Sequence, residues 1–113
     1  MHEGKMRIFT SDFKTNGNHP CAVAVSRNVP EGFKGKHIPD LAPPIHLEYV
    51  DDEQEFKQAY RSFVLNCFDP SILIAMLGDG AVLLCDCAPG RRCHRKNIAE
   101  WLSLYCSVEV KEI

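Results

Sequence analysis

The chain has 113 residues, which is enough for one domain with an ordinary hydrophobic core and too few for two. Its composition, 45% hydrophobic and 25% charged, is typical of a soluble globular protein. The formal net charge of −2 gives no general reason to expect binding to nucleic acid or to a membrane surface. No apolar run approaches the roughly 20 residues of a membrane-spanning helix.

The first residues lack the apolar core of a signal peptide, so we expect a cytoplasmic protein. Six cysteines in a reducing compartment are expected to be buried, catalytic or metal-binding. An extracellular disulfide scaffold is less favoured, because the apolar content already supports a core.

Two strands and a long loop are predicted in the N-terminal half. Residues 6–13 form the first strand, and residues 14–20 supply turn residues. Residues 21–27 are apolar and rich in β-branched side chains, which predicts a strand buried on both faces. Residues 28–44, with four prolines and two glycines, form a long irregular loop that is either a surface crossover or part of a functional site.

Two helices are predicted next. Asp51 and Asp52 open the first, whose acidic first turn suits a helix start. Its apolar residues recur at helical spacing, which predicts one buried face and makes Cys67 a small buried hydrophobe. They are Phe56, Ala59, Tyr60, Phe63, Val64 and Cys67. The second helix has Asp69 as its cap and Pro70 as its first residue, and it ends at Gly78.

The C-terminal third predicts a strand, a loop, a helix and a last strand. Residues 81–85 read as a buried strand, and residues 107–113 alternate as a strand should. Between them, helical spacing marks the last helix at Ile98, Trp101, Leu102 and Tyr105. Strands and helices thus alternate over residues 1–113. This predicts a small single-domain α/β fold with a mostly parallel sheet of about four strands flanked by helices.

The densest chemistry lies in "LLCDCAPGRRCHRKNIAEWL", residues 83–102, which is the predicted strand, loop and helix. Ligands of open α/β sheets sit at the carboxyl ends of strands, and helix starts attract anions. Arg91 and Arg95 are our candidates to hold a phosphate or carboxylate, because Arg presents a planar fork of donors. A nucleotide would be one such ligand. The competing interpretation is that the basic residues are solvated surface charges.

Thiols accompany these cations. Cys93 lies at or beside the helix start, where the dipole and nearby cations lower a thiol pKa. We therefore predict Cys93 or Cys85 as a reactive thiol, with His94 as acid or base. A direct Cys93–His94 pair is disfavoured, because successive helical side chains diverge by about 100°. The alternative for both cysteines is simple core packing.

A metal site is the second interpretation of the same cysteines. Cys85, Cys87 and Cys93 would ligate zinc, with His94 or His19 as a fourth ligand, or Cys21 if its loop comes close. Against it, paired C-x2-C knuckles are absent. A dithiol redox protein using Cys85 and Cys87 lacks a C-x-x-C motif. The nucleotide-binding motif G-x-x-x-x-G-K-[ST] is also absent. Neither Cys85 nor Cys87 is followed by both the Gly and the Arg that a tyrosine-phosphatase-like loop requires.

The segment resembles the signature of the domain of unknown function 488 family and of related short phage and bacterial domains. The matching residues are Leu83, Leu84, Cys85, Cys87, Cys93, His94 and Arg95. Upstream, Ser26, Arg27 and Pro30 look like the family's second block, and residues 69–80 resemble its helix before the strand. One departure is Cys87, where many relatives carry Glu.

This resemblance implies a small, Rossmann-like α/β fold, a cytosolic protein, and a site in which Cys85, Cys93, His94 and Arg95 join Ser26 and Arg27. It implies no activity, and whether the chain is an enzyme stays open. The favoured hypothesis is a domain that binds an anionic ligand with thiol participation. The alternatives are a zinc-binding structural or interaction module and a non-catalytic accessory protein with core cysteines.

Overall fold

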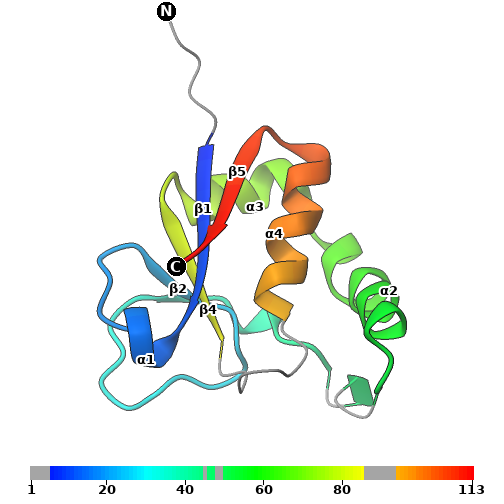
Figure 1. Ribbon diagram of the computed structural model, residues 1–113, viewed down its shortest axis with the longest axis horizontal. Coiled ribbons are helices and arrows are strands. Elements are labelled where there is room, and N and C mark those ends of the chain that lie inside the picture. The colour runs from blue at the N-terminus through cyan, green and yellow to red at the C-terminus, as the bar shows by residue number, and fades with distance from the viewer. Residues whose placement is uncertain (1–5, 45, 48–49, 86–93) are drawn as a thin grey trace, which may run out of the picture.

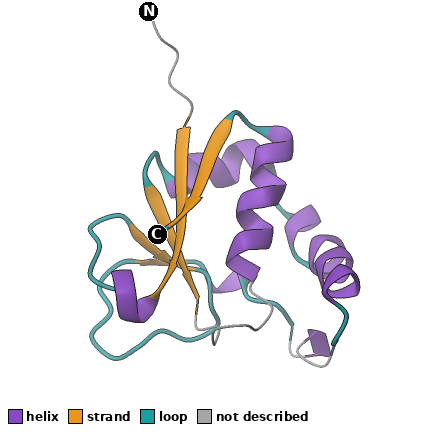
Figure 2. Cartoon of the chain, viewed as in Figure 1, coloured by secondary structure: helices purple, strands orange, loops and turns teal. Residues whose placement is uncertain are grey.

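The computed structural model describes residues 6–44, 46–47, 50–85 and 94–113. Over these residues the chain folds into a small α/β domain in which helices pack on a five-stranded sheet (Figures 1 and 2). The strands are β1 (Met6–Asp12), β2 (Ala22–Ala24), β3 (Lys36–His37), β4 (Ala81–Cys85) and β5 (Val108–Glu112). The helices are α1 (Phe13–Asn16), α2 (Glu53–Phe63), α3 (Pro70–Leu77) and α4 (His94–Tyr105), with 3-10 turns η1 (Pro39–Leu41) and η3 (Leu65–Cys67).

The sheet has the strand order β3-β2-β4-β1-β5, and every pairing in it is parallel. The predicted α/β class and parallel sheet are therefore confirmed. The fifth strand is β3, a two-residue strand inside the segment that was predicted to be an irregular loop. No periodicity could reveal it, because it is too short to show any.

The central strand β4 is buried along its whole length, and its side chains alternate between two apolar clusters. Leu83 and Cys85 join the larger cluster with residues of α2, α3 and α4, such as Tyr60, Leu73 and Leu102. The opposite side chains of β4 join a smaller cluster with Ala22, Phe9, Phe13 and Phe33. Three helices thus cover one face of the sheet, while α1 and the loops around β2 cover the other (Figure 1).

Local signals fix the helix boundaries. The Asp52 side chain accepts a hydrogen bond from the Glu55 N–H at 2.9 Å and caps α2. Asp69 accepts from the Ser71 N–H at 2.9 Å and caps α3, which begins with Pro70 as predicted. At its end, Gly78 has a φ of 82°, a conformation that favours glycine.

Two side chains on the helix face that was predicted to be buried, those of Cys67 and Phe63, are exposed. Cys67, predicted as a small buried hydrophobe, is exposed because α2 ends at Phe63 and the chain tightens into η3. Phe63 is 59% exposed, and its ring meets the His46 ring edge to face; Tyr105, at the end of α4, is 62% exposed, and its ring meets the Trp101 ring in the same way. Helical spacing gives the side of a helix on which a residue lies, but not how far the neighbouring elements extend. None of the described helices is both long and apolar enough to cross a membrane.

Candidate functional site

The carboxyl edge of the sheet gathers the predicted site residues that the structure describes. Cys85 is the last residue of β4, Ser26 and Arg27 follow β2, and α4 begins with His94 and Arg95. In space, α4 lies on the face of the larger cluster, whereas α1 and Phe33 lie on the other face. The helices that follow the neighbouring strands β1 and β4 thus lie on opposite faces of the sheet. Open α/β sheets bind ligands at the point where such helices diverge.

Other predicted site residues lie outside the described residues. They are Arg91 as an anion ligand, Cys93 as a reactive thiol, and Cys87 and Cys93 as zinc ligands. The roles assigned to them therefore remain predictions.

Cys85 and Arg95, which were predicted to belong to one site, are in direct contact. Arg95 Nη1 donates a hydrogen bond to the Cys85 Sγ at 3.2 Å, and both side chains are buried. The other two guanidinium nitrogens of Arg95 donate hydrogen bonds to the Glu112 carboxylate at the end of β5. The Nη2–Oε2 distance is 2.8 Å and the Nε–Oε1 distance is 3.5 Å. Arg95 therefore bridges the ends of two strands, β4 and β5.

Glu112 completes this arrangement and was missed in the sequence. Its carboxylate also accepts a hydrogen bond from the Thr10 hydroxyl on β1. Partial burial raises the pKa of Glu112, but the hydrogen bonds from Arg95 and Thr10 outweigh it and leave the pKa below its usual value. The carboxylate is therefore ionised at neutral pH and neutralises much of the Arg95 charge. We call Thr10, Cys85, Arg95 and Glu112 the edge network.

His94 occupies a buried position beside this network. Its Nε2 lies 2.7 Å from the Val25 carbonyl oxygen, and its ring meets the Tyr60 ring edge-on at 5.7 Å. Because a carbonyl can only accept, Nε2 carries the hydrogen and Nδ1 is the nitrogen that could take a proton. Burial lowers the pKa of His94, and the charges of Arg95 and Arg27 act in the same direction, against Cys85 and the Val25 bond.

Ser26 and Arg27 hold the segment that follows β2. The Ser26 hydroxyl donates to the Asn28 carbonyl at 2.5 Å, and His37 Nε2 donates to the Ser26 carbonyl at 2.8 Å. Arg27 is exposed and its Nη2 donates to the Pro43 carbonyl at 2.6 Å. Both predicted ligand residues thus lie at the carboxyl edge and hold the 28–44 segment there through hydrogen bonds, while their role as ligands stays a prediction.

Asp12, the last residue of β1, is a second acidic residue at this edge that the sequence did not single out. It is the register partner of Cys85, and its carboxylate accepts a hydrogen bond from the Thr15 N–H at 2.7 Å. That bond is the main reason why the pKa of Asp12 is lowered, and Arg95 adds to the effect. Its position next to β4 depends on the strand order, which the sequence does not reveal.

Cys21 and His19, two of the residues proposed to complete a zinc site, lie at the other end of the sheet from Cys85 and His94. The Cys21 carbonyl accepts from the Val82 N–H at 2.9 Å, three residues before Cys85 and so roughly 10 Å from it along the strand. His19 Nδ1 accepts from the Cys21 N–H at 3.0 Å and therefore lies there too. Within the described part of the chain, no three His, Cys, Asp or Glu side chains are grouped so that they could hold a metal ion.

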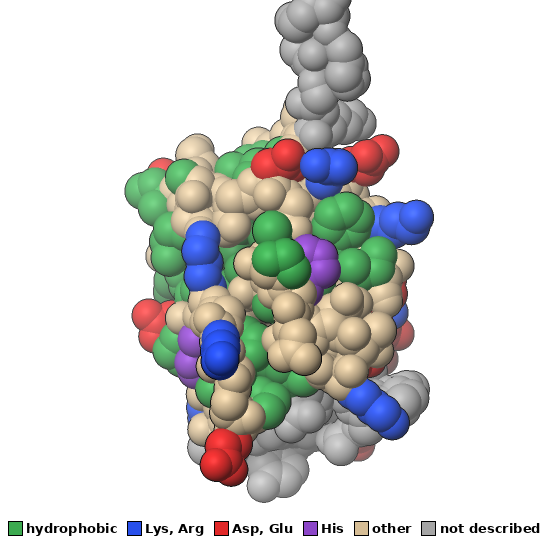
Figure 3. Space-filling view, turned by 90° about the vertical axis from the view of Figure 1, so that its left-hand side faces the viewer, with side chains coloured by type: hydrophobic (Ala, Val, Ile, Leu, Met, Phe, Trp, Pro, Cys, Tyr) green, Lys and Arg blue, Asp and Glu red, His purple; other side chains and the backbone are tan. Residues whose placement is uncertain are grey.

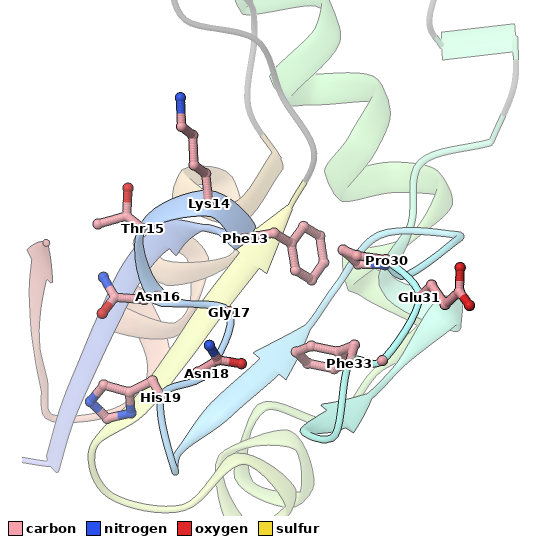
Figure 4. Close-up of a pocket in the computed structure, with 11 residues that line it drawn as sticks. Phe13, Lys14, Thr15, Asn16, Gly17, Asn18, His19, Pro30, Glu31 and Phe33 are labelled. Atoms are coloured by element: carbon pink, nitrogen blue, oxygen red, sulfur yellow. The ribbon is translucent and has the colours of Figure 1, made fainter.

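A hollow opens on the sheet face opposite the three larger helices. It lies between α1 and residues 30–33, and the Phe13 and Phe33 rings point toward one another there, 5.5 Å apart and edge to face (Figure 4). Lys14 and Thr15 point away from these rings. Figure 3 looks onto this side of the molecule, where Lys and Arg side chains are scattered rather than gathered. Because Phe13 follows Asp12 directly, the hollow begins beside the carboxyl edge.

Comparisons with protein-family models, curated proteins and solved structures find no match to this chain.

Proposed function

We propose that the chain binds a small phosphate-bearing anion at the carboxyl edge of β4, with a thiol taking part. The observation that carries this proposal is the Arg95 guanidinium donating to the Cys85 sulfur at the end of the central strand. A cationic donor next to a thiol favours the thiolate. A buried thiol with such a partner at the carboxyl edge of a parallel sheet favours a functional site over simple core packing.

The edge network changes the role first assigned to Arg95. Since Glu112 neutralises it, Arg95 fixes the site and acts on Cys85, while Arg91 and the start of α4 hold the anion. Cys85 is fully buried, so Cys93 is the thiol that we expect to react. The resemblance to the domain of unknown function 488 family remains a prediction that points to the same residues.

The hollow at Phe13 and Phe33 suits an aromatic group attached to the phosphate. It begins one residue after Asp12, the register partner of Cys85, so one ligand could reach both places. Aromatic side chains bind planar rings by stacking or edge contacts. A nucleoside monophosphate is the ligand class that combines both features.

The test measures the alkylation rate of each cysteine by mass spectrometry, with inorganic phosphate, adenosine monophosphate, or chloride at matched ionic strength. We expect phosphate to slow the alkylation of Cys93 and to leave the alkylation rates of the exposed Cys21 and Cys67 unchanged. Arg91→Ala should abolish this protection. Phe33→Ala should weaken protection by adenosine monophosphate alone. If Cys93 reacts at one rate in all three solutions, the anion site does not exist.

The zinc and accessory-protein alternatives have their own outcomes. About one zinc per chain, measured by elemental mass spectrometry without chelator, would favour Cys85, Cys87 and Cys93 as ligands. The Arg95 N–H 3.2 Å from the Cys85 sulfur opposes this, because it already occupies one side of the sulfur. If the chain is a non-catalytic accessory protein, we expect neither bound zinc nor protection of Cys93 by phosphate.

A further inference from the structure

β5 is one edge of the sheet and is longer than the opposite edge strand β3 (Figure 1). Among the described residues, no strand pairs with its outer side. Such a strand presents a row of backbone N–H and C=O groups that can pair with another chain. The composition of β5 decides which chain that is.

The backbone register shows which residues of β5 turn outward. The Ser107 carbonyl accepts from the Met6 N–H at 3.3 Å, and the Ile113 N–H donates to the Thr10 carbonyl at 2.8 Å. Odd-numbered residues of β5 therefore direct their backbone groups to β1, because the direction alternates along a strand. The residues whose N–H and C=O point away from the sheet are Val108, Val110 and Glu112.

The side chains of β5 are self-complementary about Val110. In an antiparallel pair centred there, Val110 faces Val110 of the second copy as a hydrogen-bonded pair. Glu109 of each copy then faces Lys111 of the other at the non-hydrogen-bonded positions, where side chains lie closest. Both charged side chains are exposed, and no ion pair joins either to another described residue. Val110 is 41% exposed and would be covered.

We infer that β5 pairs with β5 of a second copy of this chain, antiparallel about Val110, and joins the two sheets into one. The helices permit this approach. α4 packs over β1 and β5, so the two copies of α4 would lie about two strand spacings apart, roughly 10 Å, a normal helix packing distance. An interface of one short strand and one helix flank is small, so the dimer is weak and concentration-dependent.

Sedimentation equilibrium tests the dimer and a charge exchange tests its register. We expect the apparent mass to rise with protein concentration from 12.8 kDa toward twice that value. Lys111→Glu and Glu109→Lys should each weaken association about tenfold, because each places two like-charged pairs across the interface. The double variant E109K/K111E should restore it. Both positions are exposed, so the fold should be unchanged, which circular dichroism checks.

Val110→Pro tests the backbone pairing separately. The Val110 N–H points outward, so proline removes no bond to β1 but cannot donate to the second copy. We expect a monomer that melts as a folded protein. Hydrogen exchange at the Val110 amide should slow with concentration in the natural chain. A chain that is monomeric at every concentration, or a dimer that survives both Val110→Pro and Lys111→Glu, would overturn the inference.

Discussion

The buried imidazole of His94 predicts a specific loss of stability in mild acid. Burial lowers the pKa of His94 in the folded state, so the folded chain resists a proton that the unfolded chain accepts near pH 6.5. Stability is therefore unaffected above that pH and falls as the pH drops toward the folded-state pKa. The loss of stability between pH 7 and pH 5 is at most about 1.9 kcal/mol, which is the full free energy of protonating an unfolded imidazole of ordinary pKa over that range.

Urea unfolding at several pH values between 7 and 5 measures this loss. His94→Gln keeps an amide near the Val25 carbonyl but cannot titrate. The slope of its unfolding free energy with pH should therefore be smaller than in the natural chain, by an amount that corresponds to at most about one bound proton. His46→Gln is the matched control, because it makes the same substitution at an exposed ring. The carboxyl groups with lowered pKa, Asp12, Asp79 and Glu112, act mainly below pH 5. Equal pH dependence in His94→Gln and the natural chain would refute the reasoning.

Four other substitutions have expected outcomes in chemical denaturation. Tyr60→Phe removes a buried hydroxyl that donates to a backbone carbonyl and should cost about 1–3 kcal/mol, because the carbonyl is left unpaired; a change below about 0.5 would contradict it. Gly35→Ala places a Cβ 2.6 Å from the Ala22 carbonyl oxygen and should destabilise by about 1–3 kcal/mol, whereas an unchanged midpoint would mean that the backbone yields freely. Cys85→Ala should cost about 1–3 kcal/mol and exposed Cys67→Ala less than about 0.5, and equal effects would remove the distinction between the two thiols.

The parts of the fold that were predictable from sequence are those that local chemistry determines. Asp52 and Asp69 mark helix starts because a cap bonds to a backbone group two or three residues away. Cys85 and Arg95 could be placed near one edge because β4 and α4 follow one another in the chain, but their direct contact was not predicted. Glu112 could not be assigned in the same way, because its contact with Arg95 requires β5 to lie beside β1. That placement depends on which strands pair, and no local pattern encodes it.

Strand β5 ends in the candidate site and is also the strand proposed to pair in the dimer. The two proposals are therefore connected in a way that can be tested. Glu112 directs its carboxylate to Arg95 and its backbone outward, where it would face Val108 of the second copy. Pairing would therefore restrain the residue that orients Arg95 beside Cys85. We expect phosphate to protect Cys93 more strongly at concentrations where the dimer forms, and equally at all concentrations in Val110→Pro. If protection of Cys93 does not change with protein concentration in either protein, the anion site would still be supported, but it would not be coupled to pairing of β5.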